Sequence, residues 1–201
     1  LVPENELSAR AGIVLNPVTN GAVVDSTLMT SVPGIFACGN VLHIHDLVDR
    51  VAGEASRAGD ACADWLEGAG SGKKRAEVPL KSGSNIRYTV PSTIDPDSKT
   101  TVCLRSMVML DRAVLRITRG GAFAGGAFAG GALTGGAGFA GTEVFRKNLN
   151  WVRPGEMISV EIPAGVLNAA GQSGPATSSP VTGVAPAIAE PFEISLTAAG
   201  E

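Results

Sequence analysis

The stretch from Thr30 to Leu66 constrains the fold more than any other part of the chain. A short apolar run, residues 35–38, lies between the turn pairs Pro33-Gly34 and Gly39-Asn40. Such a run, bounded by turn residues, is typical of a buried strand. A polar connection follows, and then apolar residues recur at helical spacing. The pattern predicts a strand, a tight turn and an amphipathic helix.

The predicted helix has two distinct faces. Asp46 is the expected N-cap and Gly68 the expected stop. Residues three or four apart form an apolar face: Leu47, Val51, Ala55, Ala58, Cys62 and Trp65. The other face is charged and includes Asp49, Arg50, Arg57, Asp60, Asp64 and Glu67. We expect Glu54 and Asp60 to lie on the solvent side, where they would aid solubility.

The same stretch carries a family resemblance. Residues 30–40, T-S-V-P-G-I-F-A-C-G-N, resemble the second flavin-binding motif of the pyridine nucleotide-disulfide oxidoreductase superfamily, T-x-x-P-G-(Ile/Val)-(Tyr/Phe)-A-x-G-D. With the helix included, the run looks most like thioredoxin-reductase-like FAD/NAD(P)-dependent oxidoreductases. An upstream passage, N-E-L-S…G-I…G-A-V-V-D, extends the resemblance back to about Leu1. The resemblance covers roughly the first third of the chain.

The resemblance implies a cofactor and four residues that contact it. Gly39 and Asn40 would meet the ribityl and pyrophosphate part of FAD, and the amides of Leu47 and Val48 would lie near the pyrimidine edge of the flavin. A glycine lets the backbone approach a cofactor, and a helix N-terminus stabilises negative charge on a reduced flavin. The family has Asp where this chain has Asn40, which can accept a hydrogen bond but carries no charge.

The resemblance also implies that the chain is a fragment. The family begins with a strand and a G-x-G-x-x-G turn for the FAD pyrophosphate, and none occurs near Leu1. The matched region includes neither the nicotinamide domain nor the redox cysteine pair of the family. We therefore expect the C-terminal piece of an FAD-dependent, NAD(P)H-linked oxidoreductase, inactive without its N-terminal FAD/NAD(P) half. The alternative is a structural or interaction module with a non-functional flavin-domain remnant. A homodimer is possible. Neither the identity of the electron acceptor nor the choice between NADH and NADPH follows from the sequence.

Three regions follow from the patterning. The resemblance implies that residues 1–67 are the C-terminal part of an FAD/NAD(P)-binding domain. The pattern in this region predicts a β-hairpin in which Val14-Leu15 pairs with Val23-Val24 around an Asn-Gly turn. Residues 68–77 form a linker rich in glycine, with a basic cluster at residues 73–75. Residues 78–201 form a β-sandwich-like domain.

Alternating apolar and polar residues predict the strands of this last domain. They cover residues 85–91, 100–105, 113–118, 143–147, 156–162 and 192–196. The passage V-R-P-G-E-M at residues 152–157 resembles part of an extension found in some thioredoxin-reductase-like flavoproteins. The fold class is therefore α+β, a remnant of a Rossmann-like α/β domain followed by a small antiparallel β-sandwich.

Two low-complexity segments interrupt the strand pattern. A Gly/Ala-rich insertion, residues 120–141, repeats with a period near five and reads as an expanded hairpin loop. Its recurring Phe and Leu side chains leave a self-associating segment as the alternative. Residues 170–191, rich in Ser, Pro, Gly and Ala, read as a second loop.

Composition excludes several classes of protein. The net charge of −3, with 17% charged residues, does not suit a basic nucleic-acid-binding surface. The sequence has no apolar run long enough to span a membrane and no signal-peptide pattern, and the expected location is cytoplasmic. The three cysteines, Cys38, Cys62 and Cys103, lie far apart and predict neither a zinc site nor a local disulfide. Each is expected to be a small buried residue.

His43 and His45 are the only histidines, and they flank Ile44 just after the flavin motif. With Asp46 they could supply two metal ligands and a carboxylate, but at least one further ligand would have to come from elsewhere. One of them could act as a proton donor near the flavin, and a hydrogen-bonded loop histidine is the commonest outcome. The sequence predicts no metal site, and no nucleophile, base and acid can be assembled into a catalytic set.

Overall fold

The computed structural model describes residues 3–68, 76–120, 141–171 and 190–200. It has mixed helix and strand content and belongs to the α+β class. The helices are α1 (Glu6–Arg10), α2 (Val48–Leu66) and the 3-10 helices η1 (Gly39–Val41) and η2 (Val166–Gly171). The strands are β1 (Val78–Ser82), β2 (Ile86–Val90), β3 (Thr93–Ile94), β4 (Thr100–Ser106), β5 (Leu110–Arg119), β6 (Thr142–Val152), β7 (Met157–Ile162) and β8 (Phe192–Ala198).

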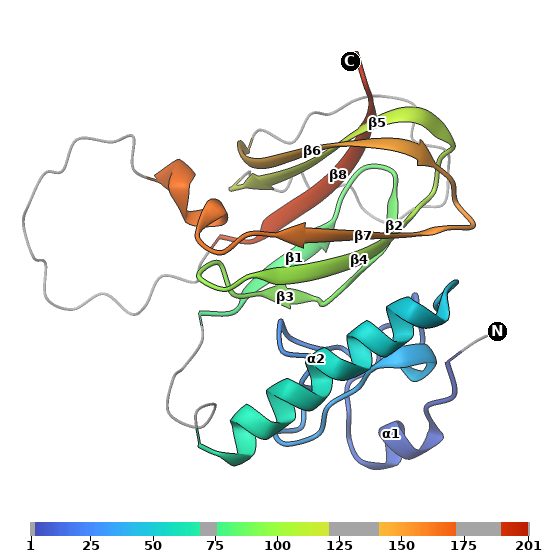
Figure 1. Cartoon of the computed structure of the whole chain (residues 1–201), viewed down its shortest axis with the longest axis vertical. Coiled ribbons are helices and arrows are strands. Elements are labelled where there is room, and N and C mark those ends of the chain that lie inside the picture. The colour runs from blue at the N-terminus through green and yellow to red at the C-terminus, as the bar shows by residue number, and fades with distance from the viewer. Residues whose placement is uncertain (1–2, 69–75, 121–140, 172–189, 201) are drawn as a thin grey trace, which may run out of the picture.

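The strands form two sheets (Figure 1). One sheet has the strand order β3-β1-β8-β5-β6 and the other has the order β2-β4-β7. All neighbours pair antiparallel except β1 and β8, which run parallel. A single hydrophobic cluster takes side chains from both sheets, among them Leu115 and Ile194 from the first and Val102 and Leu104 from the second. The two sheets therefore pack face to face around one core.

The three-stranded sheet packs on the other sheet with one face, and its strands β2 and β4 also contact the N-terminal part of the chain with the opposite face. In β4, Val102 and Leu104 point into the core between the sheets, so the intervening Cys103 points the other way. A register shift between Ile86 and Tyr88 changes the alternation in β2. As a result, Tyr88 and Val90 join a second cluster with residues of the N-terminal segment (residues 3–68). The burial pattern is thus less alternating in β2 and β4, whereas β7 keeps its alternation, with Ser159 and Glu161 exposed.

All six strands predicted from the sequence are present, with boundaries shifted by a few residues. In β8 the alternation is clear, since Phe192, Ile194 and Leu196 are fully buried and the residues between them are half-buried. Two further strands, β1 and the two-residue β3, were not predicted. The parallel pairing of β1 with β8 also differs from the antiparallel sandwich that was expected.

The strand predicted at residues 35–38 is wrong. This run makes one isolated bridge, between Met29 and Phe36, and Ile35 is 37% exposed. The predicted hairpin upstream is present in reduced form, with one bridge between Leu15 and Ala22. Asn20 adopts a positive φ of 59° in its turn. Short bridges replace strands because these residues pack against α2 and β2 through a few side chains and do not extend a sheet.

Helix α2 begins one residue later than predicted, and its buried face differs from the predicted one at Leu47 and Glu54. Leu47 is the N-cap, and its side chain is 57% exposed. Asp46 does not cap the helix, because its carboxylate binds Arg105 and the Met157 backbone. The predicted stop holds, since Gly68 follows the C-cap with a φ of 83°. The placement of Glu54 on the solvent side is wrong, because this residue is only 1% exposed, whereas Asp60 is exposed as predicted.

Parts of the remaining predictions fall on residues outside the described ranges. These are residues 69–75 of the linker with its basic cluster, residues 121–140 of the Gly/Ala-rich insertion, and residues 172–189 of the second loop.

The three cysteines are free; Cys103 is buried, and Cys38 and Cys62 are half-buried. In the described part of the chain, no helix combines the length and apolarity needed to cross a bilayer.

The packed core predicts a sharp contrast between two leucines. Leu196 is fully buried between the sheets and Leu7 is 79% exposed. We expect Leu196→Ala to lower the free energy of unfolding by about 3 kcal/mol, because it removes buried methyl groups and leaves a cavity. Leu7→Ala should change it by no more than about 0.5 kcal/mol. Urea unfolding of both variants checks this, and equal losses would contradict the described core.

Candidate functional site: a buried carboxylate with two histidines

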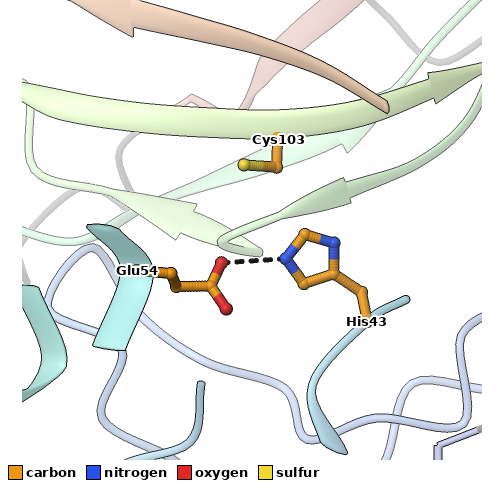
Figure 2. Close-up of side chains that lie close together, drawn as sticks. All are labelled: His43, Glu54 and Cys103. Carbon is orange, nitrogen blue, oxygen red and sulfur yellow. Dashed lines mark hydrogen bonds and ion pairs between the residues drawn. The ribbon is translucent and has the colours of Figure 1, made fainter. Parts of the chain in front are cut away.

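The carboxylate of Glu54 lies at the centre of a buried polar cluster. It projects from α2 toward the loop that follows η1 (Figure 2). Oε1 accepts hydrogen bonds from the Gly39 backbone N–H at 2.7 Å and from Nε2 of His45 at 3.0 Å. Oε2 lies 2.9 Å from Nε2 of His43. Burial alone would raise the pKa of Glu54, but the hydrogen bonds from His43 and Gly39 bring that pKa below its ordinary value.

The two histidines face one another beside this carboxylate. Their ring centroids are 4.3 Å apart, and both side chains are almost fully buried. Burial lowers the pKa of His45, and the neighbouring His43 acts in the same direction, against the attraction of Glu54. The Nδ1 atoms of both rings are buried and have no hydrogen-bond partner among the described residues. Each ring therefore has one satisfied and one unsatisfied nitrogen.

Cys103 approaches the same cluster from β4. Figure 2 shows its side chain leaving the strand on the side that faces Glu54 and His43. One potential ligand atom from each of these three residues lies within 4.8 Å of the others. Burial raises the pKa of the Cys103 thiol, and the negative charge of Glu54 raises it further. The Sγ atom also lies 3.9 Å from Oγ of Ser159.

A second polar group attaches the same loop to the sheet. Arg105 of β4 binds Oδ1 of Asp46 at 2.6 Å, the Ile44 carbonyl at 2.9 Å and the Tyr88 hydroxyl at 3.0 Å. The other oxygen of Asp46 accepts the Met157 backbone N–H at 2.5 Å. Burial opposes ionisation of Asp46, but the bonds from Arg105 and Met157 bring its pKa below the ordinary value. Asp46 is thus a tertiary anchor.

A cavity of about 470 Å³ opens beside this anchor. It lies between the loop, the start of the chain and strands β2 and β4. Its lining combines basic, aromatic and small polar groups, including Asn20, His43, Arg87, Tyr88, Arg105 and Pro154. The cavity has a positively charged wall, because Arg87 and Arg105 both reach it.

The four residues predicted to contact FAD lie near one another at the start of α2. Gly39 is buried with a φ of 72°, and a Cβ placed on it would lie 3.5 Å from Cγ1 of Val51, one turn into α2. Asn40 is exposed, and its Oδ1 accepts the backbone N–H of His45 at 3.0 Å. Leu47 and Val48 are 57% and 78% exposed. The side chains of Asn40, Leu47 and Val48 are therefore exposed, whereas Gly39 is buried in the turn before Asn40.

Sequence reasoning missed Glu54 and Cys103 as members of the cluster. Glu54 lies one helical turn before the buried Ala58, and an acid at that spacing needs partners if the face is buried. The two histidines nearby were available partners, so the signal existed. Cys103 comes from a strand about sixty residues away, and no local pattern in the sequence points to its neighbours.

Comparison with known proteins identifies no relative of this chain. No family model, no curated protein and no solved structure matches it.

The buried carboxylate predicts a large effect of a small substitution. Glu54→Gln keeps the size of the side chain but places amide hydrogens against donors from Gly39, His43 and His45. We expect a loss of about 3 kcal/mol in the free energy of unfolding near neutral pH. Glu67→Gln, at an exposed position at the end of the same helix, is the matched control and should be neutral.

The same substitution should change the pH dependence of stability. The folded state lowers the pKa of Glu54 from its ordinary value of 4.5. Its contribution is therefore complete above that value and is lost as the pH falls through the lower folded-state pKa. The difference between wild type and Glu54→Gln should shrink when unfolding is measured at about pH 3 instead of about pH 7. A difference that grows on acidification would contradict an ionised Glu54.

Proposed function

We propose that this chain belongs to an FAD-dependent, NAD(P)H-linked oxidoreductase and contributes FAD contacts through Gly39, Asn40, Leu47 and Val48. The observation that carries the proposal is the motif at residues 30–40 and its setting. The motif ends on a positive-φ glycine and an exposed asparagine, beside the exposed first turn of the 19-residue helix α2. This order of turn, amide side chain and helix start suits a dinucleotide cofactor.

Gly39 and Asn40 suit the cofactor in different ways. The N–H of Gly39 is donated to Glu54, so this residue would contribute only its backbone conformation and its lack of a side chain. Oδ1 of Asn40 accepts from His45, which leaves the side-chain NH₂ directed to no described partner. That NH₂ would donate to a ribityl or phosphate oxygen of FAD, which an aspartate at this position could not do.

The start of α2 suits the flavin end of the cofactor. No side chain caps the helix N-terminus. The N–H groups of Arg50 and Val51 donate to the Leu47 carbonyl, whereas those of Val48 and Asp49 have no acceptor among the described residues. Leu47 and Val48 add exposed apolar surface beside these donors. A flavin ring placed there would cover the apolar side chains, and the helix dipole would favour negative charge on the reduced ring.

When bound, FAD supplies the hydride chemistry, and this chain binds and orients it. The pyrophosphate turn and the nicotinamide site would come from an N-terminal FAD/NAD(P) half that the 201 residues do not include. The proposal assigns no catalytic residue to this chain and expects no NAD(P)H turnover from it alone.

A second candidate is a structural or interaction module. It is favoured by the engagement of the Gly39 N–H and the Asn40 oxygen inside the chain. It is also favoured by the packing of the N-terminal segment on Tyr88 and Val90 of β2. In that case residues 3–68 would serve to cover the three-stranded sheet, and FAD would not bind.

A titration with FAD separates the two candidates. We expect a saturable change in flavin fluorescence on addition of the purified chain, with no consumption of added NADH or NADPH. Asn40→Ala should weaken binding about tenfold, because it removes one hydrogen bond to the cofactor. Asn148→Ala, at an exposed position on β6, should leave binding unchanged.

Two results would contradict the flavin proposal. One is the absence of any saturable change up to about 1 mM FAD, a limit equivalent to a binding free energy of about −4 kcal/mol. The other is equal binding by wild type and Asn40→Ala. Either result would favour the structural module.

A further inference from the structure

We propose that His43, His45, Glu54 and Cys103 form a buried binding site for a divalent transition-metal ion, for which zinc is the closest chemical match. The proposal does not rest on flavin binding. A His-x-His pair supplies only two ligands, so a metal site at His43 and His45 needs further ligands from elsewhere in the chain. The fold brings those ligands from α2 and β4.

The spacing of three of these side chains, those of His43, Glu54 and Cys103, is close to that of a single coordination sphere. One ligand atom each from His43, Glu54 and Cys103 lies within 4.8 Å of the other two. Nε2 of His45 is 3.0 Å from Oε1 of the same carboxylate. Bond lengths of about 2.0–2.3 Å in a tetrahedral zinc site place neighbouring ligand atoms about 3.3–3.8 Å apart. Adjustments of about 1 Å or less in side-chain position would therefore bring His43, Glu54 and Cys103 onto one ion, and His45, which is bonded to the same carboxylate, is the fourth ligand that we propose.

The chemistry of the donors selects the class of metal. A thiolate and two imidazoles with one carboxylate suit zinc and its spectroscopic substitute cobalt. Magnesium and calcium prefer sets made of oxygen atoms. Four protein ligands would close the coordination sphere of zinc, which is the pattern of a structural site and not of a catalytic one.

The ring nitrogens available to the ion are the Nε2 atoms, which lie 2.9 Å and 3.0 Å from the Glu54 carboxylate. An ion held there would replace the protons that link the two rings to Glu54, and each ring would then carry its proton on Nδ1. The Nδ1 atoms of His43 and His45 have no partner among the described residues, so no existing hydrogen bond at Nδ1 opposes that change. The Gly39 N–H on Oε1 of Glu54 meanwhile holds the carboxylate in place, as outer hydrogen bonds do in metal sites.

An ion at this position would join three elements that are distant in the sequence. The histidines come from the loop after η1, the carboxylate from α2 and the thiol from β4. Figure 2 shows His43, Glu54 and Cys103 of this set. All of these side chains are almost fully removed from solvent. The ion would therefore stabilise the contact between the N-terminal segment and the three-stranded sheet.

Metal binding by the purified 201-residue chain tests the proposal directly. After treatment with a chelator, the chain should bind one equivalent of added zinc and show a higher melting temperature. With cobalt it should show a thiolate-to-metal charge-transfer band. Cys103→Ser should abolish that band and weaken zinc binding at least about 100-fold. Cys62→Ser, which changes a half-buried cysteine outside the cluster, should retain both properties.

A second variant covers the case in which Cys103→Ser fails to fold. His45→Gln should also weaken zinc binding at least about 100-fold, with circular dichroism showing that the fold is retained. The proposal is overturned if the wild-type chain binds less than one equivalent of zinc, or if the charge-transfer band depends on Cys62 and not on Cys103. These readouts require no FAD, so failure here is distinct from failure of the flavin proposal.

Discussion

The burial of one carboxylate, that of Glu54, is the constraint on which the N-terminal segment depends. An ionised carboxylate removed from water must be surrounded by donors, or the folded state becomes unfavourable. The donors here are the Gly39 N–H and the rings of His43 and His45. All three come from a span of seven residues, so the loop from Gly39 to His45 must wrap around the side of α2 that carries Glu54. The conformation of η1 and of this loop follows from that requirement.

The residues on the outer side of this loop are exposed because its inner side binds Glu54. Because the loop directs its histidines inward, Asn40 and the first residues of α2 remain at the surface. Asp46 then ends the loop on Arg105 and Met157, and this fixes the direction in which α2 begins. The buried cluster and the exposed helix start are thus two sides of one arrangement. The metal proposal concerns the inner side, and the flavin proposal concerns the outer side.

Much of the secondary structure could be predicted from the sequence, because it depends on local alternation and helical spacing. β8 and the C-terminal end of α2 at Gly68 are examples. Residues 35–38 misled the prediction, because a short apolar run between turns has the same pattern whether or not a neighbouring strand pairs with it. Glu54 was wrongly assigned to the solvent side although His43 and His45 were available as partners. The roles of Asp46 and Cys103 could not be assigned, because they come from tertiary partners up to 111 positions away in the sequence. Such partners leave no periodic signal.

The most direct test of this account is imidazole ¹⁵N NMR of the metal-free chain near neutral pH. The chain has only two histidines, so every imidazole signal belongs to His43 or His45. The account predicts that both rings carry a proton on Nε2, and that both protons exchange slowly with water because they are bonded to buried Glu54. Rings that average between tautomers and exchange rapidly with solvent would contradict the buried carboxylate on which the account depends.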